Sequence, residues 1–338
     1  MSVRELLLAG ASSERRGRTF ILDTNNTVRV YENKSGNLTL QGTPLSLPSS
    51  VAATKAFFVP NQDFIIASGG GNIYCFAWDK DTGFGSQVGS ALAGGQTLHS
   101  VSPAGDAVSV TDSEDSKIIA LSQYGFGAVL ATATNNGSGL IFSSSGNYII
   151  SNKEESLQKK TIYDWNVSTG IGSSYDTPTL SVFGFGRAAQ MSKDDSHIIV
   201  GGNSGAGGLE MFPFDGSSFG SRAGSLALNV NVIEDIAINE RQNAVAIAAA
   251  DSTSPFALVS AVPYSLSGGF GSTFGQPTNV LSNSSSNNVA YGPRSNIVAF
   301  SQTSNFGVSR ITSDGWGTAT FTDSSGSDHW TDIIEVDA

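Results

Sequence analysis

The chain has 338 residues, of which 39% are hydrophobic and only 14% are charged. The hydrophobic fraction is enough for a sizeable core, which excludes a disordered chain. The formal net charge of −11 disfavours nucleic acid as a partner, because an acidic surface repels phosphate backbones. The single cysteine, Cys75, excludes an internal disulfide and any metal site built from several cysteines.

The N-terminal residues carry no signal for secretion or membrane insertion. Their one apolar run, Leu6–Gly10, is far shorter than a signal peptide core or a membrane helix. We therefore expect a protein that is made in the cytoplasm without a signal peptide and does not insert into a membrane. The 39 glycines favour many short turns over long helices.

One motif repeats along the whole chain. Its best copy, Trp78 to Ser86, has an aromatic strand end, a polar turn and a Gly-aromatic-Gly step. The position of Phe84 recurs every 42 to 51 residues, at Leu38, Phe84, Phe126, Ile171, Phe219, Phe270 and Trp316. Propeller blades have units of ~40–50 residues. Seven units of about 46 residues nearly fill the chain, so we expect a single domain spanning residues 1–338.

Each unit shows the pattern of four short strands. An apolar segment ends in a turn, as in 98–106, and a strand rich in Ile, Val and Ala follows it. Next comes an alternating strand with aromatic residues, as in 73–78, and a weakly apolar strand follows the glycine turn. A period of two with frequent turns identifies strands. The sequence predicts an all-β fold, a seven-bladed β-propeller of four-stranded antiparallel blades.

The two ends of the chain suggest how the ring closes. Segment 329–337 resembles the first strand of a new unit, but no further strand follows it. We expect the N- and C-terminal segments to pair and close the ring, with Trp330, Ile333 and Ile334 in the closing strand. Segment 5–11 competes for the same inner position, and the sequence leaves that choice open.

Residues suited to catalysis or metal binding are sparse. His99, His197 and His329 fall in three different units, and none belongs to a His-x-x-x-His pair. Segment 79–83 resembles half of a calcium loop, but its twelfth position is Ser90 rather than a bidentate glutamate. We expect no catalytic set, no cofactor and no metal cluster, and leave open one weakly bound cation. The repeat markers are interpreted as packing residues.

Five segments carry a family resemblance: 73–86, 101–110, 161–179, 214–221 and 266–278. With their aromatic strands, glycine turns and Ser-Pro-x-Gly-Asp element, they resemble degenerate WD40-like propellers encoded by tailed bacteriophages. The Gly-His and Trp-Asp pairs of regulatory WD40 repeats are largely missing. The resemblance implies a virion component or tail-associated module, without a catalytic residue common to the family.

Three functions follow from these observations. The leading expectation is a non-enzymatic structural or interaction module of a phage virion, attached to tail or capsid and contacting other virion proteins or a host-surface glycan. The alternative is a propeller enzyme acting on glycans or lactones at the central channel, where the first strands carry His99, Asp235 and Asp332. A third hypothesis is a cytoplasmic WD40-like scaffold. Convergence of those three side chains in the channel around a metal would favour the enzyme.

Overall fold

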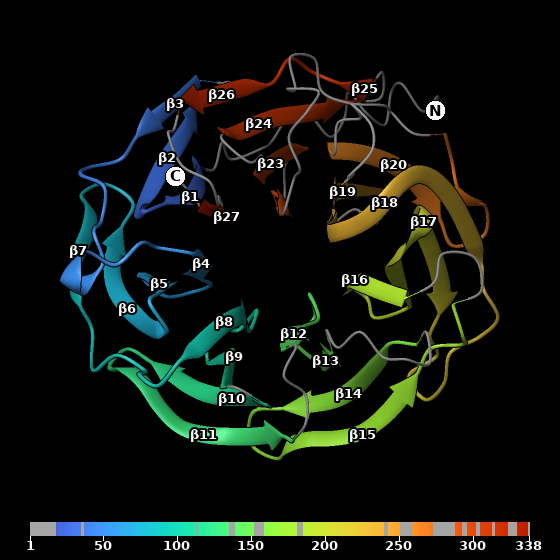
Figure 1. Cartoon of the computed structure of the whole chain (residues 1–338), viewed down its shortest axis with the longest axis horizontal. Helices are drawn as coiled ribbons and strands as arrows, with labels where there is room; N and C mark the ends of the chain where they lie inside the picture. Colours follow the sequence, from blue (N-terminus) through green and yellow to red (C-terminus); the bar gives the residue numbers. More distant parts are fainter. Residues whose placement is uncertain are drawn as a thin grey trace, which may run out of the picture.

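The computed structural model describes residues 18–34, 37–112, 114–134, 139–151, 159–180, 185–239, 243–250, 259–272, 288–292, 296–301, 305–312, 315–323 and 330–336. Antiparallel sheets form a ring around a central axis, with almost no helix (Figure 1). The predicted all-β, seven-bladed propeller of four-stranded blades is confirmed. In the described part of the chain, no helix is long and apolar enough to cross a membrane.

The first four blades follow the chain in order. Blade one contains β1 (Arg18–Asn25), β2 (Thr27–Lys34), β3 (Asn37–Leu40) and the C-terminal β27 (Trp330–Val336). A 3-10 turn, η1 (Pro48–Ser50), lies before blade two, which contains β4 (Lys55–Val59), β5 (Phe64–Gly69), β6 (Asn72–Asp79) and β7 (Gly83–Gln87). Blade three contains β8 (Gln96–Val101), β9 (Ala107–Asp112), β10 (Asp115–Ser122) and β11 (Gly125–Ala133). Blade four contains β12 (Leu140–Phe142), β13 (Tyr148–Ser151), β14 (Thr161–Asn166) and β15 (Gly170–Asp176).

Blades five and six share one continuous sheet, which the repeat pattern did not predict. Its elements are β16 (Phe185–Met191), β17 (His197–Pro213), β18 (Gly224–Ile238), β19 (Ala244–Ala250), β20 (Val259–Ser265) and β21 (Gly269–Phe270). Strand β18 pairs with β17 through its first half and with β19 through its second half. It therefore forms the outer strand of blade five and the inner strand of blade six.

Blade seven completes the ring with an interrupted outer edge. It contains β22 (Val289–Tyr291), β23 (Ile297–Ser301), β24 (Asn305–Thr312), β25 (Gly315–Trp316) and β26 (Thr320–Asp323). Both β25 and β26 pair with β24, at different places along its length. Two short strands thus take the place of the single outer strand found in blades one to four.

The hydrophobic core lies between the blades. The buried apolar residues described in the ring form seven clusters, and each cluster joins the facing sheets of two neighbouring blades. Between blades one and two, Trp78 makes edge-to-face contacts with Phe20 and Phe58, with both pairs of ring centroids 5.1 Å apart. Because both faces of a blade are covered, second strands such as β5 are apolar almost throughout.

The repeated motif forms the turn between the third and fourth strands of a blade. Gly83 has a φ of +86°, which favours glycine because it lacks a Cβ. Oδ1 of Asp79 accepts hydrogen bonds from the backbone N–H groups of Asp81 (3.0 Å) and Thr82 (2.8 Å). The segment that resembled half of a calcium loop is therefore a turn whose first carboxylate already binds its own backbone.

The repeat markers lie where the fourth strands begin. Phe84 is paired with Trp78, and Ile171 is paired with Trp165. The remaining markers are Leu38 in β3, Phe126 in β11, Phe270 in β21, Trp316 in β25 and Phe219, which forms an isolated bridge with Phe214.

Ring closure by the two ends of the chain is confirmed. Strand β27 pairs antiparallel with β1, with Ile333 opposite Ile21 and Ile334 opposite Phe20. Trp330 stands opposite Thr24, and its backbone N–H donates to the Thr24 hydroxyl at 3.1 Å. The closing position thus belongs to the C-terminal segment, while segment 5–11 and His329 lie outside the described residues.

Deleting residues 329–338 is expected to lower the melting temperature by many degrees. The deletion removes the innermost strand of blade one and exposes Ile21, which is fully buried. Deleting residues 337–338 alone is the control, because β27 ends at Val336. Differential scanning calorimetry of both variants tests the closure, and equal melting temperatures would contradict it.

Candidate functional site

A cavity of about 330 Å³ lies at the centre of the ring. Residues of all seven inner strands line it: β4, β8, β12, β16, β18, β22 and β27. In Figure 1, β4, β8, β12 and β16 face the middle of the ring, whereas β7, β11 and β15 form its rim. A cavity of this size suits a small molecule.

Lys55 lies beside the cavity on β4. Its Nζ is 4.5 Å from the ring centroid of Trp330, an arrangement typical of a cation–π contact. Phe57 contacts the same indole edge-to-face, with centroids 5.4 Å apart. Burial lowers the pKa of the Lys55 ammonium, and attraction by Asp235 opposes that change. The Lys55 amine is therefore a donor of N–H groups beside an acidic side chain.

Asp235 occupies the inner strand of blade six. Oδ2 accepts hydrogen bonds from Asn288 Nδ2 (2.7 Å) and from the Val289 backbone N–H (3.0 Å), both in blade seven. Oδ1 accepts from the Ile236 backbone N–H at 2.9 Å. Burial outweighs these bonds and the attraction of Lys55, and it raises the pKa of Asp235 to about 6.

Asp332 occupies an equivalent place on the closing strand. Oδ2 accepts a hydrogen bond from the Phe58 backbone N–H of blade two, and Oδ1 accepts one from the Ile333 N–H, both at 2.9 Å. Burial raises the pKa of Asp332 to about 6. Asn288 links the two acids, because its Oδ1 accepts from the Thr331 N–H at 2.8 Å while its Nδ2 donates to Asp235. Both carboxylates thus join the inner strands of neighbouring blades.

His99 enters the cavity from blade three. Strand β8 has an irregular register between Leu98 and Ser100, so His99 is the extra residue of a β-bulge, a feature that re-aims a side chain. Its Nε2 lies 2.8 Å from Thr111 Oγ1. Burial, aided by the charge of Lys55, lowers the pKa of His99 to about 3. His99 is therefore neutral at physiological pH.

The three side chains named from the sequence do converge: His99, Asp235 and Asp332 line the same cavity. Trp330, proposed for ring closure, lines it as well. Sequence reasoning missed Lys55, whose signal was a lysine on an inner strand of a lysine-poor chain. In the described ranges, no three or more His, Cys, Asp or Glu residues are grouped so that they could hold a metal ion.

His197 belongs to a different environment. It is buried, and its Nε2 lies 3.1 Å from the Tyr264 hydroxyl, while its Nδ1 lies 3.0 Å from Ser196 Oγ. Tyr264 is on β20, so this pair joins blades five and six. The structure gives His197 a structural part away from the central cavity.

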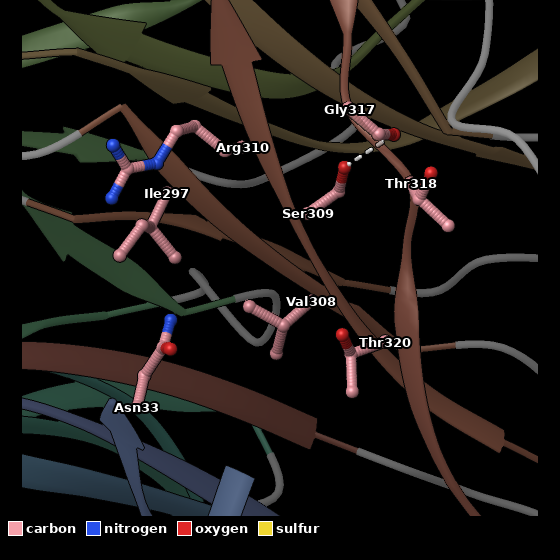
Figure 2. A pocket seen from close by; sticks show the side chains of 8 residues that line it. All are labelled: Asn33, Ile297, Val308, Ser309, Arg310, Gly317, Thr318 and Thr320. Atoms are coloured by element: carbon pink, nitrogen blue, oxygen red, sulfur yellow. Dashed lines mark hydrogen bonds between the residues drawn. The ribbon is translucent and has the colours of Figure 1, made fainter. Parts of the chain in front are cut away.

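A second cavity, of about 420 Å³, lies at the seam between blades seven and one. Figure 2 shows its lining, in which the Ser309 hydroxyl donates to the Gly317 carbonyl at 3.0 Å. The lining residues are Asn33, Ile297, Val308, Ser309, Arg310, Gly317, Thr318 and Thr320. Among these eight residues only Arg310 is ionisable. The acid–base chemistry is therefore concentrated in the central cavity rather than in the seam cavity.

Comparisons with known proteins reveal similar folds. The sequence matches no protein-family model and no curated protein. A protein from Bacteroides uniformis, provisionally named a 6-phosphogluconolactonase, superposes with a TM-score of 0.68 and 11% identity over 94% of this chain and 99% of its own. The periplasmic gluconolactonase PpgL of Pseudomonas aeruginosa superposes with a TM-score of 0.66 and 12% identity, over 94% of this chain and 99% of its own. Hsv2 of Kluyveromyces lactis superposes with a TM-score of 0.59 and 9% identity, over 90% of this chain and 94% of its own. Identities this low demonstrate a shared fold alone.

The prediction of a non-enzymatic virion module is wrong. Similar structures include proteins named as lactonases, in agreement with the alternative of a propeller enzyme. The error has a physical cause: the ionisable groups of the channel come from separate blades, such as His99 from blade three and Asp332 from blade one, and a search for local motifs does not detect such a set. The resemblance to phage WD40-like propellers holds for the propeller fold only, since none of these three neighbours is named as a phage protein or as a WD40 protein.

Proposed function

We propose that the chain is a lactone hydrolase whose site is the central cavity. The observation that carries this proposal is the convergence of His99, Asp235 and Asp332 from blades three, six and one on one cavity, with Lys55 of blade two beside it. Shifted pKa values gathered in one cavity are typical of active sites. Names of structural neighbours supply the substrate class, since one is a gluconolactonase and another is provisionally a 6-phosphogluconolactonase.

Asp332 is assigned as the general base. A carboxylate with a pKa near 6 is ionised at neutral pH and is basic enough to accept a proton from water. An ionised carboxylate offers about four acceptor positions, and Asp332 uses two of them for the Phe58 and Ile333 amides. Asp235 accepts three hydrogen bonds and attracts Lys55, which suits it to positioning that lysine.

Lys55 and His99 are assigned to the lactone carbonyl. Asp332 takes a proton from a water molecule whose oxygen attacks the carbonyl carbon. The carbonyl oxygen gains negative charge, and N–H donors directed at it stabilise that charge. When the ring C–O bond breaks, the ring oxygen takes the proton from Asp332 and leaves as a hydroxyl group. The product is the open-chain hydroxy acid.

Replacing Lys55 with methionine tests this assignment. Wild-type protein is expected to hydrolyse D-glucono-δ-lactone faster than buffer does, and the Lys55→Met variant is expected to lose about 10²–10³-fold in kcat/KM, because it lacks a donor to the oxyanion. Acid release in a pH-stat measures the rate. A phosphorylated gluconolactone is the second substrate.

Lys80→Met is the matched control. Lys80 lies in an exposed turn of blade two, far from the central cavity, so its variant is expected to keep the wild-type rate. Hydrolysis by Lys55→Met at the wild-type rate would remove Lys55 from the mechanism. A wild-type protein no faster than buffer with either lactone would overturn the proposed function.

A further inference from the structure

The His99 ring belongs to a chain of hydroxyl groups that runs from the cavity into blade three. Nε2 of His99 lies 2.8 Å from Thr111 Oγ1, and Thr111 Oγ1 lies 3.2 Å from Ser116 Oγ. Thr111 on β9 is 5% exposed and Ser116 on β10 is fully buried. Three successive strands of one blade therefore supply the chain, and the Ser116 hydroxyl lies in the protein interior.

This chain allows two positions for the proton of the His99 ring. A neutral imidazole has one N–H donor and one acceptor nitrogen, and a hydroxyl has a single proton to donate. If Thr111 donates to Nε2, it is able to accept from Ser116, and the ring proton resides on Nδ1. In the reverse arrangement Nε2–H donates to Thr111, which donates to Ser116, and Nδ1 becomes an acceptor.

The chemistry of the cavity distinguishes these two arrangements. A pKa of about 3 makes His99 a poor base at neutral pH, so a lone pair on Nδ1 would contribute little to proton abstraction. The two acids, Asp235 and Asp332, already provide acceptors with pKa values near 6. A neutral N–H donor, in contrast, can polarise a carbonyl without bringing a second positive charge next to Lys55.

We propose that the Ser116–Thr111 hydroxyl chain holds neutral His99 in the Nδ1–H tautomer, which makes His99 a hydrogen-bond donor to the carbonyl oxygen of a lactone. This step rests on the proposed function and deepens it. Thr111 is then a positioning residue, because it acts through His99 and does not touch the substrate. Ser116 orients Thr111 in the same way.

Gly139 fixes the ring from the opposite side. A Cβ added to this glycine would lie 2.3 Å from atoms of the His99 ring, and its φ of +89° favours glycine. The bulge of β8, the Thr111 hydroxyl and the Gly139 backbone together leave the imidazole little freedom to rotate. The orientation of the ring is thus set by blades three and four before a ligand arrives.

Nitrogen-15 NMR of histidine-labelled protein tests the proposal without any substrate. The chain has only three histidines, so the His99→Asn variant assigns the His99 signals by their absence. Long-range correlations between ring protons and nitrogens identify the protonated nitrogen. Wild-type protein is expected to show the Nδ1–H pattern throughout pH 5 to 8, and Thr111→Val is expected to lose that pattern. Thr111→Ser is expected to restore it.

Ser109→Ala is the matched control. Ser109 is a fully buried hydroxyl on the same strand, and its Oγ has no hydrogen-bond partner among the described residues. Its removal is expected to leave the His99 signals unchanged. Melting curves verify that each variant is folded. An Nε2–H pattern in wild-type protein, or an unchanged pattern in Thr111→Val, would overturn the proposal.

The kinetic arm tests the donor role. Loss of an orienting partner typically costs about 10–100-fold, so Thr111→Val is expected to lower kcat on gluconolactone by that factor with a smaller change in KM. Thr111→Ser is expected to recover most of the rate. A wild-type rate in Thr111→Val would overturn the donor role even if the tautomer is as proposed. If wild-type protein hydrolyses no lactone, the proposed function and donor role fall together, while the NMR result alone decides the tautomer.

Discussion

Replacing Asp332 with asparagine is expected to lower kcat/KM for lactone hydrolysis by about 10²–10⁴-fold, the usual contribution of a general base. Asparagine has nearly the same shape, and its carbonyl oxygen can still accept the Phe58 N–H that joins blades one and two. It cannot accept a proton from water. The rate is measured by acid release at pH 7.5, and circular dichroism verifies the fold.

The pH dependence of wild-type protein provides the second readout of Asp332. Only the ionised carboxylate accepts a proton, and its pKa is raised to about 6. Below pH 6 the ionised fraction falls about tenfold for each pH unit, so log kcat/KM is expected to rise with unit slope from pH 4 to 6 and to level off above pH 7.

Three variants separate this base from other acids. Asp332→Asn is expected to lose the acidic limb of the profile. Asp235→Asn is expected to be slower but to keep that limb, because Asp332 is retained. Asp215→Asn is the exposed control: Asp215 accepts hydrogen bonds in a rim turn and has a pKa lowered to about 2, so its removal is expected to change neither rate nor profile. If the Asp332→Asn variant keeps the acidic limb of the pH profile, Asp332 is not the general base.

The fold was predictable because its signals are local and repeated. The turn at Asp79–Gly83 and its sister copies can be identified one by one, and seven copies at a nearly constant spacing correspond to seven blades. Closure by β27 was also predictable, since a first strand without a following blade needs a partner. The choice between the C-terminal strand and segment 5–11 required the register of β1, which pairs Ile21 with Ile333.

The fusion of blades five and six was not predictable from the repeat. Strand β18 continues without a turn from the rim to the channel: its residues up to Val232 pair with β17, and those from Val232 onward pair with β19, with a register shift between Ile233 and Asp235. A β-bulge inserts a single extra residue into one strand, so it is hard to recognise in an apolar sequence. The same is true of the bulge at His99.

The candidate site was only half predictable. His99, Asp235 and Asp332 could be named as first-strand residues, but the sequence does not tell which side chains of a strand reach the channel. Lys55 was overlooked because it lies more than forty positions from each of them in the chain. In a propeller, a site is assembled across blades, so a missing local motif says little about catalysis.

Asp235 and Asp332 have a structural part as well as a proposed chemical one. Each accepts the backbone N–H of the next inner strand, Val289 or Phe58, and so joins two blades at the channel. Accepting a backbone hydrogen bond with a buried carboxylate requires desolvation of a charge, which costs free energy. A neutral acceptor side chain would avoid that cost. Retaining acids at these positions is consistent with a need for their basicity.

Trp78→Ala is expected to destabilise the protein by about 3–5 kcal/mol, the usual cost of removing a large aromatic side chain from a core. Trp78 is 4% exposed and contacts both Phe20 of blade one and Phe58 of blade two. Its loss therefore leaves a void between two blades rather than within one. Urea unfolding measures the change, which is a large part of the ~5–15 kcal/mol that stabilises a typical protein.

Two further variants show whether this effect belongs to the blade interface. Trp78→Phe keeps a ring between Phe20 and Phe58, and the indole N–H that it removes has no partner in the described part of the chain, so a smaller loss is expected. Tyr124→Ala changes an aromatic residue that is 77% exposed on a rim turn, and it is expected to stay within about 0.5 kcal/mol of wild type. A loss below about 1 kcal/mol for Trp78→Ala would mean that the repeat aromatics mark the blades without holding them together.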